Sequence, residues 1–295
     1  MIEVLQPGPA AYVEDLGRPG LASLGVGRSG AADRGALVRV NRLLGNPDEA
    51  AAVEVTLGGL QVRFRGDHVV ALTGARVPAT LAGVPVAGDT VLRARPGDVL
   101  VLGVATAGLR TYLGVRGGLV VSPVLGSRSW DVLAELGPAP LRAGDVLTVG
   151  RPSGPGPVAE RSRPPAATGP GASVRVEVDV EPGVREEWFG AGAWETLVGG
   201  SYRVTPDSNR VALRLDGATL ARAGGGELPS EGLVRGAVQV PPSGKPVVFL
   251  ADHPVTGGYP VVGVVTSAGV DRLAQLRPGD ALRFRAARAG RREAG

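Results

Sequence analysis

Glycine and proline interrupt this chain so often that long helices are excluded over most of its length. They account for 47 and 25 of the 295 residues, about twice the usage expected of a helical bundle. Between them lie short apolar runs rich in valine, which are typical of strands bounded by tight turns. The sequence therefore predicts a mainly β fold with a few short helices. The expected strands are 53–57, 69–72, 99–102, 111–115, 174–180, 202–205, 247–250 and 261–265.

A weak internal repeat indicates two tandem all-β halves. The turn Arg-Pro-Gly-Asp occurs at 95–98 and again at 277–280, with a variant at 142–145, so that a copy lies near the end of each half. Between the halves, one stretch consists mostly of Pro, Gly, Ala and Ser without a hydrophobic period, which is typical of a linker. We expect an N-terminal domain at 1–150, a linker at 151–172, a C-terminal domain at 173–288 and a tail at 289–295.

The clearest helix is expected at 33–44. Asp33 is a good N-cap, apolar residues recur at helical spacing, and Gly45 with Pro47 ends the pattern. A second short helix is expected near 271–275.

Composition removes several function classes. Cysteine is absent, which excludes disulfides, thiolate nucleophiles and cysteine-bound zinc. With only two histidines, we expect no transition-metal site, although a carboxylate-bound Mg²⁺ remains open. Lys245 is the only lysine, and the arginines are scattered along the chain, so we expect no nucleic-acid partner. No long apolar run suggests a signal peptide or membrane span, and we expect a cytoplasmic protein that does not contact membranes.

The segment 25–30 matches the dinucleotide-binding pattern G-x-G-x-x-G. That pattern requires a preceding buried strand and an alternation of strands and helices, which a β-rich chain lacks. Two interpretations stay open. The loop, with Arg28 and Ser29, leads into a helix N-terminus that suits a carboxylate or phosphate, or it is simply a turn that Asp33 caps.

A second candidate site follows the apolar strand that ends at Leu250. Asp252, His253, Thr256 and Tyr259 lie within eight residues braced by two glycines and two prolines. Asp252 can orient His253 or act as a base, and His253 titrates near neutrality. The alternative is a β-turn whose polar side chains satisfy local backbone groups.

Four polar residues interrupt apolar segments: Asn41, Glu54, Glu231 and Gln239. Strand alternation predicts that Glu54 and Gln239 face solvent, opposite their valine neighbours. The chain contains neither a P-loop nor a G-x-S-x-G nucleophile elbow.

Several uncommon strings occur in an order that resembles the 5-oxoprolinase C-subunit family, also called allophanate hydrolase subunit 2 or the biotin-dependent carboxyltransferase domain. The likeness covers nearly the whole chain outside the linker and tail. The strings are DLGRPG at 15–20, GRSGAAD at 27–33, NRLLGNP at 41–47, VRGG at 115–118, VLGSRS at 124–129, SEG at 230–232, GAVQVP at 236–241, and the residues 252–259.

The resemblance implies two cyclophilin-like β-barrels and a hetero-oligomer with homologues of the 5-oxoprolinase A and B subunits. Together they would hydrolyse 5-oxoproline to L-glutamate, with ATP and Mg²⁺ acting at the level of the complex. ATP would phosphorylate the amide oxygen, and water would then open the ring. Because a covalent biotin needs a lysine between methionines, and Lys245 lies in Ser-Gly-Lys-Pro, we expect no covalently bound biotin.

Within that family the candidate residues take roles. We expect Arg28 and the backbone of Ser29 to Ala31 to hold the substrate carboxylate, and Asp252 and His253 to handle protons or water. The predicted catalytic residues are Asp252, His253 and Glu231. The predicted substrate-binding residues are Arg28, Ser29, Gly30, Asn41, Gln239, Thr256 and Tyr259.

Three departures from the family pattern, at Gly27, Trp130 and Asn209, leave the substrate open. The enzymatic alternative is a urea carboxylase or allophanate-type carboxyltransferase relative. The non-enzymatic alternative is an antagonist that binds a B-subunit homologue resembling a kinase inhibitor.

Overall fold

The computed structural model describes residues 1–152, 156, 175–223 and 228–287. The chain folds into two compact units. Unit 1 is Met1–Ala172 with Ala274–Arg277, and unit 2 is Ser173–Leu273 with Pro278–Gly295. Most of the expected linker and the whole expected tail lie outside the described residues, so the domain limits stay a prediction.

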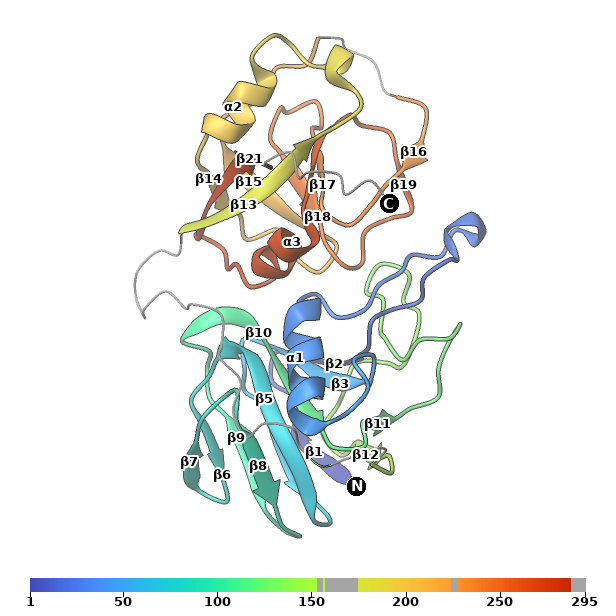
Figure 1. Ribbon diagram of the computed structural model, residues 1–295, viewed down its shortest axis with the longest axis vertical. Coiled ribbons are helices and arrows are strands. Elements are labelled where there is room, and N and C mark those ends of the chain that lie inside the picture. Colours follow the sequence, from blue (N-terminus) through green and yellow to red (C-terminus); the bar gives the residue numbers. More distant parts are fainter. Residues whose placement is uncertain (153–155, 157–174, 224–227, 288–295) are drawn as a thin grey trace. The chain divides into compact units, whose positions relative to one another are not determined.

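The strands of unit 1 form two sheets (Figure 1). One sheet has the order β11-β12-β1-β4-β9-β6-β7 and the other β2-β3-β10-β5-β8. The strands are β1 (Ile2–Gln6), β2 (Ala10–Glu14), β3 (Ala52–Thr56), β4 (Gln61–Phe64), β5 (His68–Arg76), β6 (Ala79–Leu81), β7 (Val84–Val86), β8 (Val91–Ala94), β9 (Val99–Leu102), β10 (Ala107–Val115), β11 (Leu119–Val120) and β12 (Val146–Val149).

The mainly β class with few helices is confirmed, and the strands of unit 1 are arranged in two sheets. Its two sheets keep separate edges, and β7 at one edge carries Pro85. Proline has no N–H to donate to a further strand, so pairing ends there. Valine and leucine side chains of both sheets form the core between them, including Val53, Val62 and Leu100.

Helix α1 (Arg34–Leu44) packs on the five-stranded sheet (Figure 1). Asp33 caps it as predicted, since its carboxylate accepts from Ala36 N at 2.8 Å, and Gly45 ends it in the left-handed conformation. Leu37, Val40 and Leu44 are buried against the sheet. A short 3₁₀ helix, η1 (Ala22–Leu24), lies in the preceding loop.

Unit 1 includes a four-residue segment from much later in the chain, Ala274–Arg277. Gln275 Oε1 accepts from the backbone N–H of Leu109 and of Arg110, both at 2.9 Å, where β10 carries an irregular register. Its amide nitrogen donates to Asp33 Oδ2 at 2.7 Å and to the Arg110 carbonyl at 3.0 Å. One side chain therefore satisfies the backbone of the bulge in β10.

Unit 2 is a closed barrel with the strand order β13-β20-β17-β18-β15-β14-β21, and β16 and β19 form a separate two-stranded sheet. Tyr202 and Phe284 pack edge to face in its interior, with ring centroids 5.5 Å apart. Its elements are β13 (Arg175–Pro182), η2 (Glu186–Trp188), α2 (Ala193–Gly199), β14 (Tyr202–Val204), β15 (Ala212–Gly217), β16 (Glu231–Gly232), β17 (Ala237–Gln239), β18 (Val247–Phe249), β19 (Thr256–Gly257), β20 (Val261–Val265), α3 (Ser267–Leu273) and β21 (Ala281–Ala286).

Candidate functional site

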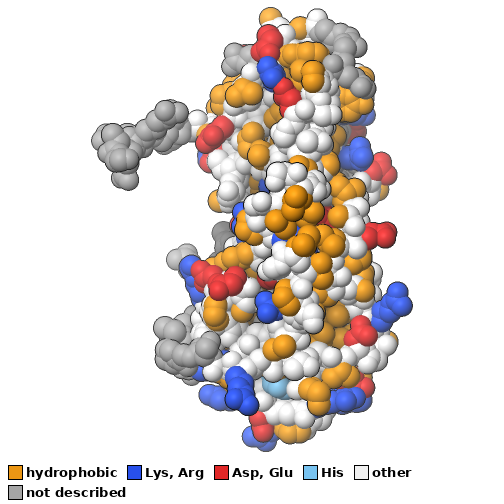
Figure 2. Space-filling view, turned by 90° about the vertical axis from the view of Figure 1, so that its right-hand side faces the viewer, with side chains coloured by type: hydrophobic (Ala, Val, Ile, Leu, Met, Phe, Trp, Pro, Cys, Tyr) orange, Lys and Arg blue, Asp and Glu red, His pale blue; other side chains and the backbone are white. Residues whose placement is uncertain are grey.

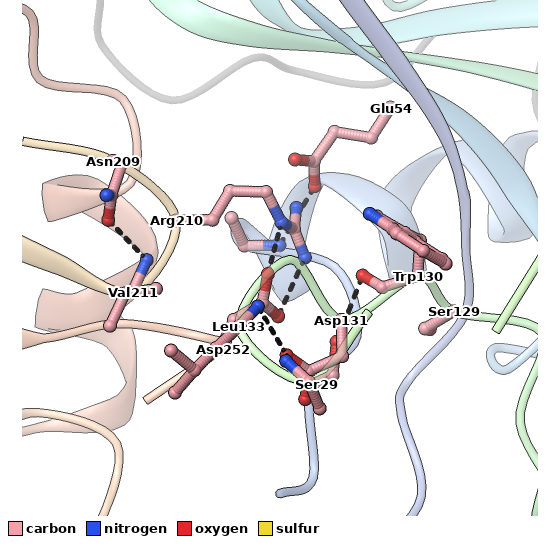
Figure 3. Close-up of polar contacts among 12 residues, drawn as sticks. Ser29, Glu54, Ser129, Trp130, Asp131, Leu133, Asn209, Arg210, Val211 and Asp252 are labelled. Carbon is pink, nitrogen blue, oxygen red and sulfur yellow. Dashed lines mark hydrogen bonds and ion pairs between the residues drawn. The ribbon is translucent and has the colours of Figure 1, made fainter. Parts of the chain in front are cut away.

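The loop before α1 holds the predicted residues Arg28, Ser29 and Gly30. Ser29 is fully buried with a φ of 52°, and Gly30 follows with a φ of 96°. Two consecutive left-handed residues form a sharp turn, and such a conformation at serine must be held by its surroundings. The Ser29 hydroxyl donates to the Trp130 carbonyl at 3.3 Å (Figure 3).

Arg28 is the exposed cation of this loop. Its Nε donates to the Leu16 carbonyl at 3.3 Å, which fixes the base of the guanidinium. No ion pair to Arg28 occurs among the described residues. An exposed guanidinium that is held at Nε and has no ion pair suits the binding of a carboxylate.

The N–H groups that follow this loop are taken by internal acceptors, which corrects part of our expectation. Ala31 N donates to the Asp15 carbonyl at 2.9 Å, and Ala32 N donates to Glu54 Oε2 at 2.9 Å. Asp33 N donates to the Tyr112 hydroxyl at 2.8 Å. The anion near the start of α1 is therefore the protein's own Glu54, and the Ala31 N–H does not hold a substrate carboxylate.

Glu54 is fully buried, so the prediction that it faces solvent is wrong. It lies in β3, one face of which packs on the core between the sheets while the other packs on α1. Because both faces of the strand are covered, alternating side chains do not reach solvent on either side. The Tyr112 hydroxyl donates to Glu54 Oε2 at 2.6 Å, and Arg110 Nε lies 3.4 Å from Oε1. Burial, and then the nearby Glu54 charge, raise the pKa of Tyr112 well above its usual value.

Asn41 is also fully buried, and its contacts are internal. Its amide nitrogen donates to the carbonyls of Asp48 and Ala50, at 3.1 and 2.7 Å, and Asn46 donates to its oxygen at 3.3 Å. Both amide donors are thus used to hold the loop after α1. The contacts of Asn41 are thus structural, and its role in substrate binding stays a prediction.

Asp252 of unit 2 is fully buried in an ion pair with Arg210 (Figure 3). Arg210 Nε donates to Oδ2 at 2.7 Å and Nη2 donates to Oδ1 at 3.2 Å. Both carboxylate oxygens accept from one guanidinium, which fixes the orientation of the carboxylate. Asp252 therefore braces the start of the loop, and its catalytic role stays a prediction.

His253 is half-buried beside Asp252, and its Nδ1 lies 2.7 Å from the Pro254 carbonyl. A carbonyl only accepts, so we assign the proton to Nδ1, which leaves Nε2 with the lone pair in the neutral ring. The ring packs against Phe249 with centroids 6.4 Å apart. This arrangement gives a histidine of fixed tautomer that can accept a proton.

The remaining predicted residues of unit 2 meet around the same loop. Strands β16 and β19 pair Glu231 with Gly257, and the Gln239 amide donates to the Tyr259 carbonyl at 3.0 Å. Gln239 is buried, contrary to the expected solvent face. Thr256 is exposed and Tyr259 is half-buried.

The Glu231 carboxylate forms an ion pair with Arg185 and is about one-third exposed. Glu231, like Asp252, is therefore bound to an arginine of its own unit. We take His253 forward as the candidate for moving a proton.

The buried carboxylate of Asp15 joins two of the quoted strings and was not among the predicted residues. Asp15 accepts from the hydroxyls of Ser127 and Ser129, at 2.6 and 2.7 Å, and from the backbone N–H of Arg128 at 2.6 Å. The partners lie more than one hundred residues away in the sequence. The only feature of the sequence that pointed to this contact was that both strings belong to the family pattern.

Known proteins resemble this chain in sequence and in fold. Residues 24–286 match the family model described as carboxyltransferase domain, subdomain A and B. The chain belongs to the carboxyltransferase-domain family. The C subunit of the Escherichia coli K12 5-oxoprolinase is 34% identical over 96% of this chain and 90% of its own length. The urea amidolyase of Lachancea kluyveri is 33% identical over 96% of this chain.

This carboxyltransferase-domain chain corresponds to only a small part of each urea amidolyase. It spans 17% of the Lachancea kluyveri urea amidolyase. A crystal structure of the Kluyveromyces lactis urea amidolyase matches with a TM-score of 0.89 and 30% identity, covering 97% of this chain and 19% of that one. The same fold therefore occurs as a separate polypeptide and as a module of a longer chain.

Unit 1 of the carboxyltransferase-domain chain also contains a pocket of about 660 Å³ that none of the predicted site residues line. His68, Arg93, Asp67 and Asp98 contribute to its rim. The charges of two aspartates and two arginines, Arg93 and Arg95, cancel there, so the pocket does not favour ligands of one sign of charge. The lining residues are Asp67, His68, Val69, Leu81, Ala82, Arg93, Ala94, Arg95 and Asp98.

The surface and the helices of the carboxyltransferase-domain chain show three further features. On the face in Figure 2, basic and acidic side chains are interspersed. Among the described residues, every helix is too short or too polar to cross a bilayer. Lys245, the only lysine, forms an exposed ion pair with Asp216 at 2.7 Å.

Proposed function

We propose that this chain is part of an ATP-dependent 5-oxoprolinase, which hydrolyses 5-oxoproline to L-glutamate together with homologues of the A and B subunits. The observation that carries the proposal is the match to the C subunit of the Escherichia coli 5-oxoprolinase, which extends over 90% of that protein's own length. In the urea amidolyases, by contrast, the matching part is a small share of the chain.

The proposed role of Arg28 is to bind the carboxylate of 5-oxoproline. Its guanidinium is exposed and held at Nε by the Leu16 carbonyl. Replacing Arg28 by alanine is expected to raise KM more than it lowers kcat, because a carboxylate remote from the reacting amide is bound alike in the ground and transition states. An unchanged KM would remove Arg28 from this role.

The proposed role of His253 is to accept a proton from the attacking water. The bond from Nδ1 to the Pro254 carbonyl places the lone pair of the neutral ring on Nε2, the atom that would take the proton. Replacing His253 by alanine is expected to lower kcat about 10²- to 10⁴-fold, the usual contribution of a general base. Near-normal turnover would show that another group takes the proton.

ATP and Mg²⁺ are assigned to the assembly as a whole, and no catalytic step is assigned to them on this chain. The chain lacks a P-loop. In the described part of the chain, no three His, Asp or Glu side chains are grouped as metal ligands. The described side chains therefore form no metal site made of protein ligands alone.

The proposal is tested by mixing the chain with its A-subunit and B-subunit homologues, ATP and Mg²⁺, and by measuring glutamate release from 5-oxoproline. Each protein is omitted in turn. Turnover that requires this chain supports the proposal. Carboxylation of urea in the presence of a biotin carrier, without glutamate release, would favour the carboxyltransferase alternative that the urea amidolyase relatives suggest. A stable complex with a B-subunit homologue but no turnover would favour the antagonist.

A further inference from the structure

We propose that Asp15 is the positioning residue that holds the Arg28–Gly30 loop in its binding conformation. The inference rests on the proposed function, because it assigns the substrate contact to Arg28. Asp15 itself directly follows strand β2 and is 6% exposed. It reaches the substrate only through its neighbours.

The Asp15 carboxylate accepts four hydrogen bonds from two segments. Oδ1 accepts from Gly17 N at 2.8 Å and from the hydroxyls of Ser127 and Ser129, at 2.6 and 2.7 Å. Oδ2 accepts from Arg128 N at 2.6 Å. Two of the donors are backbone N–H groups and two are hydroxyls, so both carboxylate oxygens are used to hold the two segments together.

The backbone around Asp15 clamps the Arg28–Gly30 loop on the other side. Its carbonyl accepts from Ala31 N at 2.9 Å, and Arg18 N donates to the Arg28 carbonyl at 2.8 Å. A Cβ at Gly17 would lie 2.4 Å from the Arg28 carbonyl oxygen and 2.6 Å from that of Ser29. The two backbones therefore touch directly, and a shift of residues 15–18 must move residues 28–31.

Arg18 holds the opposite side of Ser129. Its side chain is 1% exposed, and its Nη2 donates to the Ser129 carbonyl and, at 3.4 Å, to the Leu136 carbonyl. Its Nε donates to the Val124 carbonyl at 3.4 Å. The guanidinium and the Asp15 carboxylate thus both bind Ser129, and this rigid segment carries Trp130, whose carbonyl accepts from the Ser29 hydroxyl.

This arrangement explains how a serine keeps a left-handed backbone at the site. Such a conformation persists only where the surroundings fix it. Asp15→Asn replaces one acceptor oxygen by an NH₂ group that faces N–H or O–H donors. We expect the loop to loosen, KM for 5-oxoproline to rise about tenfold and kcat to change less than about twofold, since Arg28 is misplaced while His253 is untouched.

Asp131→Asn provides a matched control in the same segment. Asp131 is 2% exposed, and its Oδ1 accepts from Leu133 N and Ala134 N, at 2.9 and 3.0 Å, within its own turn. The change from aspartate to asparagine is the same, but it leaves the Asp15 contacts intact. Ser129→Ala, which removes a donor to Asp15, and Ser129→Thr, which keeps it, separate the hydroxyl from the packing.

The test measures KM and kcat of the reconstituted complex together with acrylamide quenching of Trp130. Quenching is read in the full chain with Trp188→Phe and Trp194→Phe, so that Trp130 is the only fluorophore of its kind. We expect Asp15→Asn and Ser129→Ala to raise both KM and quenching, with recovery in Ser129→Thr and no change in Asp131→Asn. Wild-type KM and quenching in Asp15→Asn would overturn the inference.

The two readouts separate this inference from the proposed function. If the wild-type assembly does not turn over 5-oxoproline, the proposed function fails. Quenching of Trp130 then decides the positioning role by itself. Equal quenching in Asp15→Asn and Asp131→Asn would overturn the role of Asp15, whatever the substrate.

Discussion

The two units differ in how they use buried polar side chains. Unit 1 buries many of them, among them Glu54, Arg110, Asp15 and Arg18. In the described part of unit 2, the buried polar side chains are Arg210, Gln239 and Asp252. The difference follows the architecture, because a closed barrel pairs the backbone of each strand with its neighbours, whereas open sheets leave edges and loops that other groups must satisfy.

Each unit therefore fixes its candidate residues in a different way. In unit 1, side-chain clusters fix the loops that carry Arg28 and Ser29. In unit 2, the loop of His253 begins at one buried ion pair on a barrel whose strands hold one another. We expect the stability of unit 1 to depend on individual polar residues more than that of unit 2. Fluorescence of Trp130 reports unit 1, and Trp188 and Trp194 report unit 2.

We expect the greatest loss of stability from Arg110→Ala. It leaves Glu54 buried without its cation and removes the donor to the Ala274 carbonyl, which should cost unit 1 about 3–5 kcal/mol in the free energy of unfolding. Arg285→Ala, which removes the exposed pair with Asp179 on the barrel, should produce no measurable change at about 0.15 M salt. Urea unfolding checks both, and equal losses would contradict the difference between the units.

The next effect concerns the close approach of Gly17 to the Arg28–Gly30 loop. Gly17 and Gly20 have almost the same φ, 83° and 85°, but only at Gly17 would a Cβ meet other atoms. Gly20→Ala should cost about 1–2 kcal/mol for the left-handed conformation alone. Gly17→Ala should cost about 1–3 kcal/mol more because of the clash. Similar melting temperatures for the two variants would contradict the contact.

A smaller effect is expected at Gln275. Gln275→Ala leaves the N–H groups of Leu109 and Arg110 without their acceptor, and it should destabilise unit 1 by about 2 kcal/mol. In the barrel, Gln239→Ala removes one donor to the Tyr259 carbonyl and should cost about 1 kcal/mol. Faster amide exchange at residues 109–110 would confirm the first, and unchanged exchange would refute it.

The last effect is absent at neutral pH and appears only in alkali. Burial raises the pKa of Tyr112 well above 10 and that of Tyr202 to about 12. Below pH 10 both tyrosines are protonated in the folded and unfolded chains, so their contribution is fully present there. Above pH 10 the unfolded chain loses the proton first, and stability should fall by about 1.4 kcal/mol per pH unit for each group.

Two single variants assign this slope to the units. Tyr112→Phe should flatten the alkaline slope of unit 1, and Tyr202→Phe that of unit 2. The loss should level off near pH 12 for unit 2, where folded Tyr202 also ionises, and continue further for unit 1. Slopes that survive both substitutions would show that other groups control the alkaline transition.

Local chemistry was enough to predict the eight expected strands and two helices, whereas many strands, among them β1, β6 and β11, were missed. The expected strands 99–102 and 261–265 coincide with β9 and β20, and the helix at 33–44 has the predicted caps. The helix expected near 271–275 is α3, which begins four residues earlier and ends at Leu273. Helix α2 was missed, because seven residues between glycines give too short a periodic pattern.

The site was harder to predict, because its contacts span long sequence separations. Asp33 and Gln275 are 242 residues apart, and Asp15 and Ser129 are 114 apart. Alternation also failed at Glu54, since both faces of β3 are covered. Residue type identified Arg28, His253 and Asp252 as candidates, but only the fold separates the bracing carboxylate of Asp252 from the ring of His253.

The proposed function is decided by a titration of this chain into fixed amounts of its A-subunit and B-subunit homologues with ATP, Mg²⁺ and 5-oxoproline. We predict that the initial rate of glutamate formation rises from background to a plateau at a fixed molar ratio of this chain. A rate that is the same with and without this chain, at every ratio, would contradict its assignment to a 5-oxoprolinase.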